Sequence, residues 1–127
     1  MSTTTRNFSL SMKTSAGFDR SLALLRQSLR HEGLRVVAEI PFHQVFAREL
    51  GLSWQKYTVL IVWSPFLGYW GALSDRDVGM FLPFHLVVAE DETGTLISAT
   101  NVALFGQLAG TIGVQVLTEA LGCVNTR

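Results

Sequence analysis

The spacing of hydrophobic and polar residues predicts a strand and then a helix in the first third of the chain. Residues 7–13 alternate between apolar and polar side chains, which predicts a strand with one buried face. Residues 16–32 then repeat apolar side chains every three or four positions and stop at Gly33, which predicts an amphipathic helix. We expect Thr14 and Ser15 to cap this helix and its apolar stripe to lie in the core. The stripe consists of Phe18, Leu22, Leu25 and Leu29.

Two strands and a short helix are predicted in the middle of the chain. Residues 34–40 indicate a strand that ends at Pro41, because proline cannot donate a hydrogen bond to a neighbouring strand. Residues 42–50 have apolar side chains on one helical face and are followed by a glycine, which predicts a short helix. We place His43 on the polar, solvated side of that helix. Residues 57–63 form a β-branched, largely apolar run and predict a central strand with apolar side chains on both faces.

The second half of the chain predicts a helix, a hairpin and two final helices. The expected ranges are 65–73 (helix), 80–90 and 95–100 (strands), and 102–108 and 111–121 (helices). Asp91 to Gly94 has the composition of the hairpin turn between the two strands. Residues 1–5 are polar and are expected to be loose.

The predicted order is β-α-β-α-β-α-β-β-α-α, with no internal repeat and no long linker. Such an order favours an α+β two-layer sandwich, with helices packed on one face of a mainly antiparallel sheet. We expect a single domain over residues 1–127, with a core at about 8–101 and C-terminal helices at 102–122.

Composition narrows the classes of partner. Only 16% of the 127 residues are charged, and 48% are hydrophobic, so a monomer would have few charges with which to cover its surface. We therefore expect a buried subunit interface, and a homodimer as its simplest form. Ten basic residues balance ten acidic ones without a basic run, which argues against nucleic acid as a partner.

No segment has the character of a membrane span or a signal peptide. Residues 57–73 and 102–118 are uncharged, but Pro65 and several glycines interrupt them. The polar N-terminus lacks the apolar core of a signal peptide, so we expect a soluble, cytoplasmic protein. The lone cysteine, Cys123, excludes an internal disulfide.

The central stretch resembles the DUF302 family, a group of small α+β domains of unassigned function. The similarity covers about residues 8–101. The residues that carry it are Phe18, Leu34, Tyr57, Pro65, Asp75, Gly79, Leu82, Pro83, Val87, Glu90 and Gly94. Family members often have cysteines at the positions of Trp63 and Phe84. The resemblance therefore implies a related pocket without thiol chemistry, because neither aromatic side chain can act as a thiolate.

Prolines mark two points of the central stretch, Ser64-Pro65 and Pro83-Phe84. The candidate ligand site lies where these two points are expected to meet. Its residues are Trp63, Ser64, Pro65, Tyr69, Trp70, Pro83, Phe84 and His85. Aromatic walls with a few polar groups suit a small apolar or aromatic ligand, so we expect a non-catalytic binding or accessory protein. The same aromatic residues also fit a core and dimer interface, which leaves a structural or protein-interaction module as the alternative.

A hydrolase-type enzyme that uses Ser64 and His85 is a weaker alternative. The sequence has no Gly-x-Ser-x-Gly elbow and no identifiable acidic partner for the histidine. Metal ligands are not expected, because His31, His43 and His85 fall on three different predicted elements. No glycine-rich phosphate-binding motif is present, and we expect no cofactor.

Overall fold

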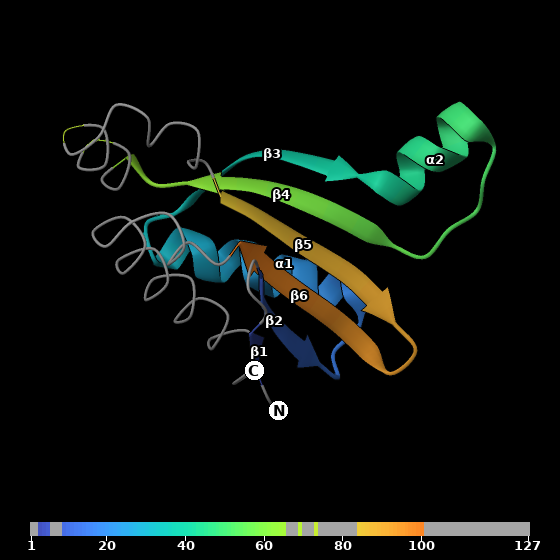
Figure 1. Ribbon diagram of the computed structural model, residues 1–127, viewed down its shortest axis with the longest axis horizontal. Helices are drawn as coiled ribbons and strands as arrows, with labels where there is room; N and C mark the ends of the chain where they lie inside the picture. Colours follow the sequence, from blue (N-terminus) through green and yellow to red (C-terminus); the bar gives the residue numbers. More distant parts are fainter. Residues whose placement is uncertain (1–2, 6–8, 66–68, 70–72, 74–83, 101–127) are drawn as a thin grey trace.

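The computed structural model describes residues 3–5, 9–65, 69, 73 and 84–100, which form an antiparallel sheet and two helices (Figure 1). The sheet has six strands in the order β1-β2-β6-β5-β4-β3, and every neighbouring pair is antiparallel. The strands are β1 (Thr3–Thr5), β2 (Ser9–Thr14), β3 (Arg35–Pro41), β4 (Tyr57–Trp63), β5 (Phe84–Asp91) and β6 (Gly94–Thr100). The helices are α1 (Phe18–His31) and α2 (Phe42–Leu50). This arrangement confirms the predicted α+β class.

The ends of α1 are set by short-range hydrogen bonds. Gly17, and not the predicted Thr14 or Ser15, is the N-cap residue, because the Thr14 hydroxyl instead accepts the Ala16 N–H at 3.2 Å. At the other end, Gly33 adopts a positive φ of 79°. The Gly33 N–H donates to the carbonyl of Arg30, and the next N–H, from Leu34, donates to that of Leu29. This pattern is the Schellman motif, and it ends the helix where the glycine predicted.

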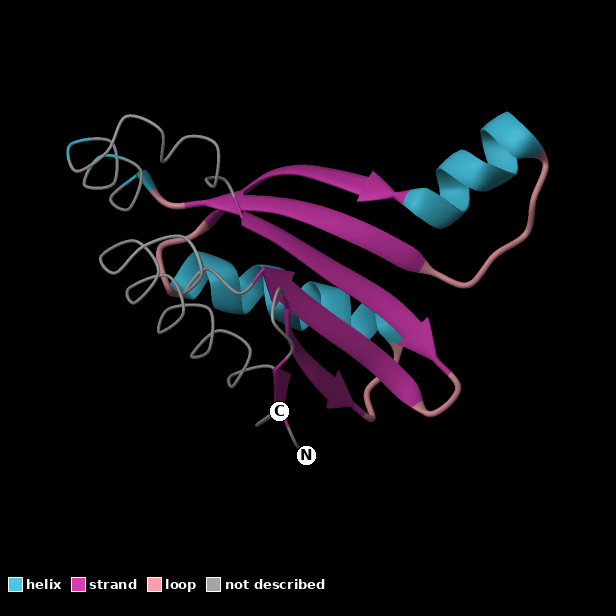
Figure 2. Ribbon diagram, viewed as in Figure 1, coloured by secondary structure: helices cyan, strands magenta, loops and turns pink. Residues whose placement is uncertain are grey.

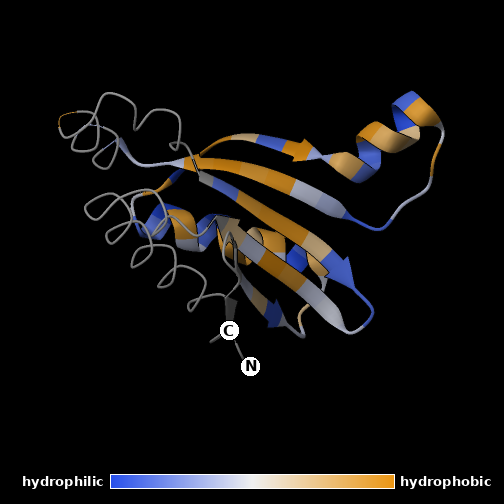
Figure 3. Ribbon diagram, viewed as in Figure 1, coloured by the Kyte–Doolittle hydropathy of each residue, from blue (hydrophilic) through white to orange (hydrophobic). Residues whose placement is uncertain are grey.

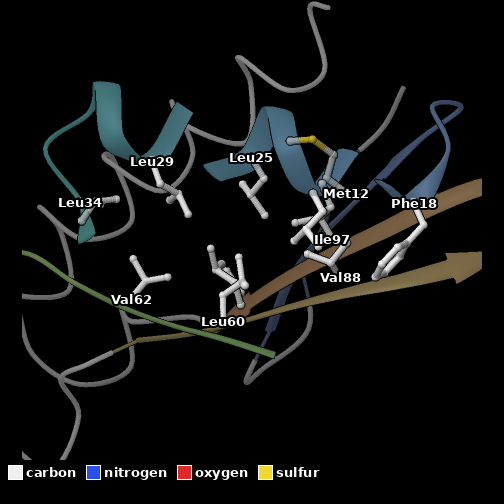
Figure 4. Packing of buried hydrophobic residues seen from close by; sticks show 12 residues of the cluster. Met12, Phe18, Leu25, Leu29, Leu34, Leu60, Val62, Val88 and Ile97 are labelled. Atoms are coloured by element: carbon white, nitrogen blue, oxygen red, sulfur yellow. The ribbon is translucent and has the colours of Figure 1, made fainter. Parts of the chain in front are cut away.

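Helix α1 runs along one face of the sheet (Figure 2), and the hydrophobic core lies between them. Figure 4 shows leucines of α1 directed toward apolar side chains of the strands. Leu25 and Leu29 are fully buried, as are Leu60 and Val62 of β4. The apolar residues that recur every three or four positions in α1 therefore pack against those that alternate along the strands, as the sequence predicted. The other members of the core cluster are Met12, Phe18, Leu22, Leu34, Leu86, Val88, Ile97 and Ala99.

The strand β4 differs from its prediction in one respect. It has neighbours on both sides, β5 and β3, as expected for an interior strand. Leu60 and Val62 are fully buried against α1. On the other face Val59 is buried, whereas Ile61 and Trp63 are only half-buried. The expectation of burial on both faces therefore holds at Val59 but was wrong for Ile61 and Trp63, because among the described residues α1 covers only one side of the sheet.

Helix α2 begins directly after β3 and extends beyond the end of the sheet, away from α1 (Figure 1). Its bounds match the predicted 42–50, and Gly51 ends it with a positive φ of 65°. None of its residues is buried, although apolar and polar residues alternate along it at helical spacing (Figure 3). Amphipathic pattern alone therefore did not place this helix on the core.

Other predictions are corrected or lie outside the described residues. Thr3–Thr5 was expected to be loose, but it pairs with Leu10 to Met12 as an edge strand, because β-branched threonines suit a pleated surface. The predicted helices at 102–108 and 111–121, and nearly all of the one at 65–73, fall outside the described part of the chain. Within that part, neither helix is long and apolar enough to cross a membrane.

Candidate functional site

The residues of the predicted pocket are only partly described. Trp63 and Ser64 are half-buried at the end of β4, and Pro65 and Tyr69 beyond them are exposed. His85, near the start of β5, is exposed as well. Trp70 and Pro83 lie outside the described residues, so the pocket itself remains a prediction.

The register of β4 against β5 separates the predicted residues into two groups. Val62 is the partner of Phe84, and Ile61 is the partner of His85. Val62 faces α1, so alternation places position 84 on the α1 face and positions 63 and 85 on the opposite face. The end of β4 and the start of β5 lie side by side at one end of the sheet. Their aromatic positions, Trp63 and Phe84, nevertheless belong to opposite faces.

The structure contains a different cleft, between α1 and the junction of β3 with α2. Its volume is about 500 Å³, which is within the range of small-molecule sites. Buried apolar side chains of α1, Phe18 and Leu22, contribute to its wall, and charged and polar groups make up most of the remainder. The lining residues are Phe18, Asp19, Leu22, Arg26, Glu39, Pro41, His43, Gln44, Lys56 and Thr58.

His43 is a polar side chain of the cleft that is held by backbone and ring contacts. It lies in the first turn of α2, and its Nδ1 accepts the Tyr57 N–H at 2.9 Å. The same Nδ1 lies 3.1 Å from the Tyr57 carbonyl oxygen, so both backbone groups of Tyr57 contact the ring. In the tautomer in which Nδ1 accepts the N–H, the hydrogen of the neutral ring is on Nε2. The ring also meets Phe18 edge to face, with 5.9 Å between centroids. These contacts fix the imidazole and leave Nε2–H as its remaining donor.

Two ion pairs stand in the same cleft. Arg26 of α1 binds Glu39 of β3 through both carboxylate oxygens, with Nε–Oε2 at 2.8 Å and Nη2–Oε1 at 2.6 Å. This hydrogen bonding raises the pKa of the Arg26 guanidinium. The second pair joins Lys56 Nζ to Asp19 Oδ2 at 3.1 Å. The two pairs fasten α1 to β3 and to the start of β4, which together form the walls of the cleft.

The position of Lys56 is set by the backbone around it. Its N–H donates to the Glu90 carboxylate at 2.9 Å, and its carbonyl accepts the Glu90 N–H at 2.8 Å. The ammonium group lies 5.8 Å from the centre of the Phe18 ring, within the range of a cation–π interaction. The backbone of Lys56 is therefore fixed, and its long, flexible side chain lines the cleft.

The sequence did not reveal this cleft. The expectation that His43 is solvated on the polar side of its helix was wrong, because the fold brings the backbone of Tyr57 against its ring. The residues involved come from α1, β3, α2 and the start of β4, so only the packing of these elements unites them. A possible signal was the position of a histidine immediately after the strand-ending Pro41 and Phe42, where the chain changes direction.

The titratable residues of the cleft do not form a metal centre. Over residues 3–5, 9–65, 69, 73 and 84–100, no three His, Cys, Asp or Glu side chains gather closely enough to hold a metal ion. In the cleft itself, the carboxylates of Asp19 and Glu39 are each engaged by a cation. The chemistry that the arrangement supports is recognition by hydrogen bonds and charge.

Comparison with known proteins places this fold in a family. A crystal structure of an uncharacterized conserved protein DUF302 from Bacillus stearothermophilus is similar, with a TM-score of 0.79 and 22% sequence identity. The similarity covers 94% of this chain and 97% of that chain, and at this identity it shows the fold alone. No curated protein matches the sequence. The family DUF302, described as a domain of unknown function, matches residues 10–122. Because that match spans most of the chain, the protein belongs to the DUF302 family.

Proposed function

We propose that this domain is a non-catalytic binding protein for a small molecule, and that the ligand occupies the cleft beside His43. The observation that carries the proposal is a cleft of about 500 Å³ in which Nδ1 of the histidine accepts the backbone N–H of Tyr57. Because this contact fixes the ring, Nε2–H of His43 can donate to a ligand without a further loss of side-chain freedom. The proposal moves the expected ligand from the aromatic residues around Trp63 to a site with more polar walls.

The cleft combines the features that small-molecule sites share. Phe18 and Leu22 offer buried apolar surface, while Gln44, Thr58 and the two ion pairs offer hydrogen-bonding groups. Such a combination orients a ligand through a few polar contacts and holds it by apolar contact. Neither a nucleophile activated by a base nor a metal centre is required for this role.

A screen by two-dimensional NMR tests the proposal. A panel of small apolar, aromatic and polar compounds is titrated into the ¹⁵N-labelled protein, and we expect saturable shifts at the amides of Phe18, His43 and Lys56. The variant His43→Phe keeps an aromatic ring but lacks the acceptor and donor, so we expect it to lose these shifts. The matched control is His85→Phe, because His85 is exposed on the other face of the sheet.

The pair of histidine variants also separates the two candidate sites. Loss of binding in His43→Phe with retention in His85→Phe supports the cleft. The reverse result would move the ligand to the site around Trp63 and His85. Absence of saturable shifts across the whole panel would contradict a binding function.

A second candidate function is a homodimeric interaction module. Aromatic and exposed apolar residues on helix α2 and in the segment after it support this candidate. Phe42, Phe46, Trp54 and Tyr57 form a series of ring contacts with centroids 5.0–5.9 Å apart. Beyond this series, Leu50 and Leu52 are largely exposed. Exposed apolar side chains that lie together often mark a contact surface, and a second copy of this poorly charged chain is the partner proposed here.

Light scattering tests the dimer. At micromolar concentration we expect twice the monomer mass for the wild type and the monomer mass for Leu50→Glu on α2. Leu96→Glu is the control, because Leu96 is an exposed apolar residue of β6. A wild-type monomer would rule out this candidate, and a monomer produced only by Leu96→Glu would place the interface on the sheet.

A further inference from the structure

The charges that line the cleft balance each other, and this balance bears on which ligands the cleft can hold. Arg26 and Lys56 are its cations, and Asp19 and Glu39 are its anions. The histidine ring is neutral when its Nδ1 accepts the Tyr57 N–H. A ligand with a net charge would leave water for a site without a compensating excess of opposite charge, which is unfavourable. A cleft whose lining charges sum to zero therefore favours a ligand with no net charge.

The two ion pairs differ in how easily they can be opened. The pair of Arg26 with Glu39 has two short hydrogen bonds in the fork geometry that suits guanidinium and carboxylate. The pair of Lys56 with Asp19 has a single contact at 3.1 Å, and the Asp19 side chain is 81% exposed. Water therefore competes strongly for the second pair. A ligand can replace that pair at small cost, while the first pair remains as a wall.

We infer that the cleft binds a small zwitterion, an amino acid with an apolar side chain, which inserts between Lys56 and Asp19. The ligand carboxylate replaces Asp19 as the partner of the lysine ammonium, and the ligand ammonium becomes the partner of the Asp19 carboxylate. Nε2–H of His43 supplies a further donor, since it has no hydrogen-bond partner among the described residues. This inference rests on the proposed binding function.

The apolar part of the ligand has a surface to meet in the same cleft. Phe18 and Leu22 of α1 are buried by more than nine-tenths and contribute to the lining, as does Pro41. The ammonium of Lys56 already lies near the Phe18 ring, so the charged and apolar surfaces adjoin each other. An aliphatic side chain placed against this surface is removed from water, which favours binding.

Three matched probes test the inference: leucine, N-acetylleucine and leucinamide. They share one side chain, but at neutral pH the first is a zwitterion, the second an anion and the third a cation. Binding is measured by NMR titration at the amides of Phe18, His43 and Lys56. We expect leucine to bind about tenfold or more tightly than either blocked compound, because each block removes one charge-assisted contact.

Variants of the exposed ion pair complete the test. Lys56→Met and Asp19→Asn each remove one charge without removing a buried side chain, and we expect each to weaken leucine binding about tenfold. The control is Glu49→Gln, which removes the anion of another exposed ion pair, the one with Arg48. Both residues of that pair are on α2 and do not line the cleft. Circular dichroism checks that each variant is folded.

The outcomes separate the inference from the function on which it rests. Equal or tighter binding of a blocked compound at the same amides overturns the zwitterion and leaves the proposed binding function standing. Leucine binding that survives both Lys56→Met and Asp19→Asn overturns the insertion between these residues. If none of the three probes produces saturable shifts, the inference is overturned. If the broader panel produces none either, the proposed function is overturned as well.

Discussion

The two helices of this domain have similar sequence patterns but different surroundings. Both have apolar residues at helical spacing, and both are followed by a glycine with positive φ. Helix α1 places six buried residues against the sheet, whereas α2 has none. The pattern therefore predicts that a helix forms and which of its faces is apolar. It does not say whether another part of the same chain covers that face.

The difference follows from where each helix leaves the sheet. A sharp turn after β2, in which the carbonyl of Ala16 accepts hydrogen bonds from the Ser21 and Thr95 hydroxyls, directs α1 across the strands. Helix α2 continues from β3 at the edge of the sheet, beyond the last strand residue. It is tied to the body through His43, whose ring receives the Tyr57 N–H. The cleft lies at the boundary between these two regions.

The largest expected effect is a contrast between two leucines. Leu25 of α1 is fully buried, and Leu50 of α2 is 62% exposed. Leu25→Ala should lower the free energy of unfolding by about 2–5 kcal/mol, because it removes core contacts and leaves a cavity. Leu50→Ala should change it by less than about 0.5 kcal/mol. Urea denaturation measures both, and a comparable loss for Leu50→Ala would mean that α2 is covered by a partner.

The hairpin turn between β5 and β6 should be the next most sensitive point. Gly94 abuts the connection that leads into α1, so a Cβ at this position would lie 3.0 Å from the Cα of Ser15 and still closer to the Thr14 carbonyl. Gly94→Ala should therefore destabilise the fold by roughly 1–3 kcal/mol. Gly17→Ala is the comparison, because a Cβ added there would meet nothing within 4 Å and the substitution changes only the N-cap residue of α1. Thermal unfolding monitored by circular dichroism should show a larger decrease in Tm for Gly94→Ala than for Gly17→Ala.

A smaller effect is expected for the ion pair that joins α1 to β3. Glu39→Gln weakens the bidentate contact with Arg26, whose side chain is about two-fifths exposed. Exposed pairs contribute roughly 0.2–1 kcal/mol, so the loss of unfolding free energy should fall in that range and shrink at high salt. Glu49→Gln on α2 should have no measurable effect, because its pair with Arg48 is more exposed. Denaturation at two salt concentrations checks both variants.

The smallest effect should appear only in acid. Lys13 holds the pKa of the Asp91 carboxyl below its usual value, mainly through a hydrogen bond. Because the folded pKa is the lower one, this contribution to stability is present above the unfolded pKa of about 3.8 and is lost as pH falls through the folded value. We therefore expect wild type to lose stability more steeply than Asp91→Asn below about pH 4. Parallel slopes of Tm against pH for the two proteins would contradict this.

Local signals in the sequence determined most elements of the described fold. The bounds of α2 and β4 were predicted to the residue, because Pro41 and Gly51 mark the ends of the helix and the apolar run 57–63 has clear limits. The α+β class followed from the order of these elements. The short strand Thr3–Thr5 was missed, since a row of threonines has no apolar alternation and becomes a strand only by pairing with β2.

The tertiary structure alone decided which residues share a surface. Trp63 and Phe84 looked like two sides of one pocket, but the register of β4 with β5 assigns their positions to opposite faces. His43 and Lys56 looked unrelated, yet the return of the chain from α2 to β4 brings both to one cleft with Asp19. The sequence determines local conformation because propensity and spacing act over a few residues. Strand register and helix packing join distant residues, so the candidate site exists only in the folded chain.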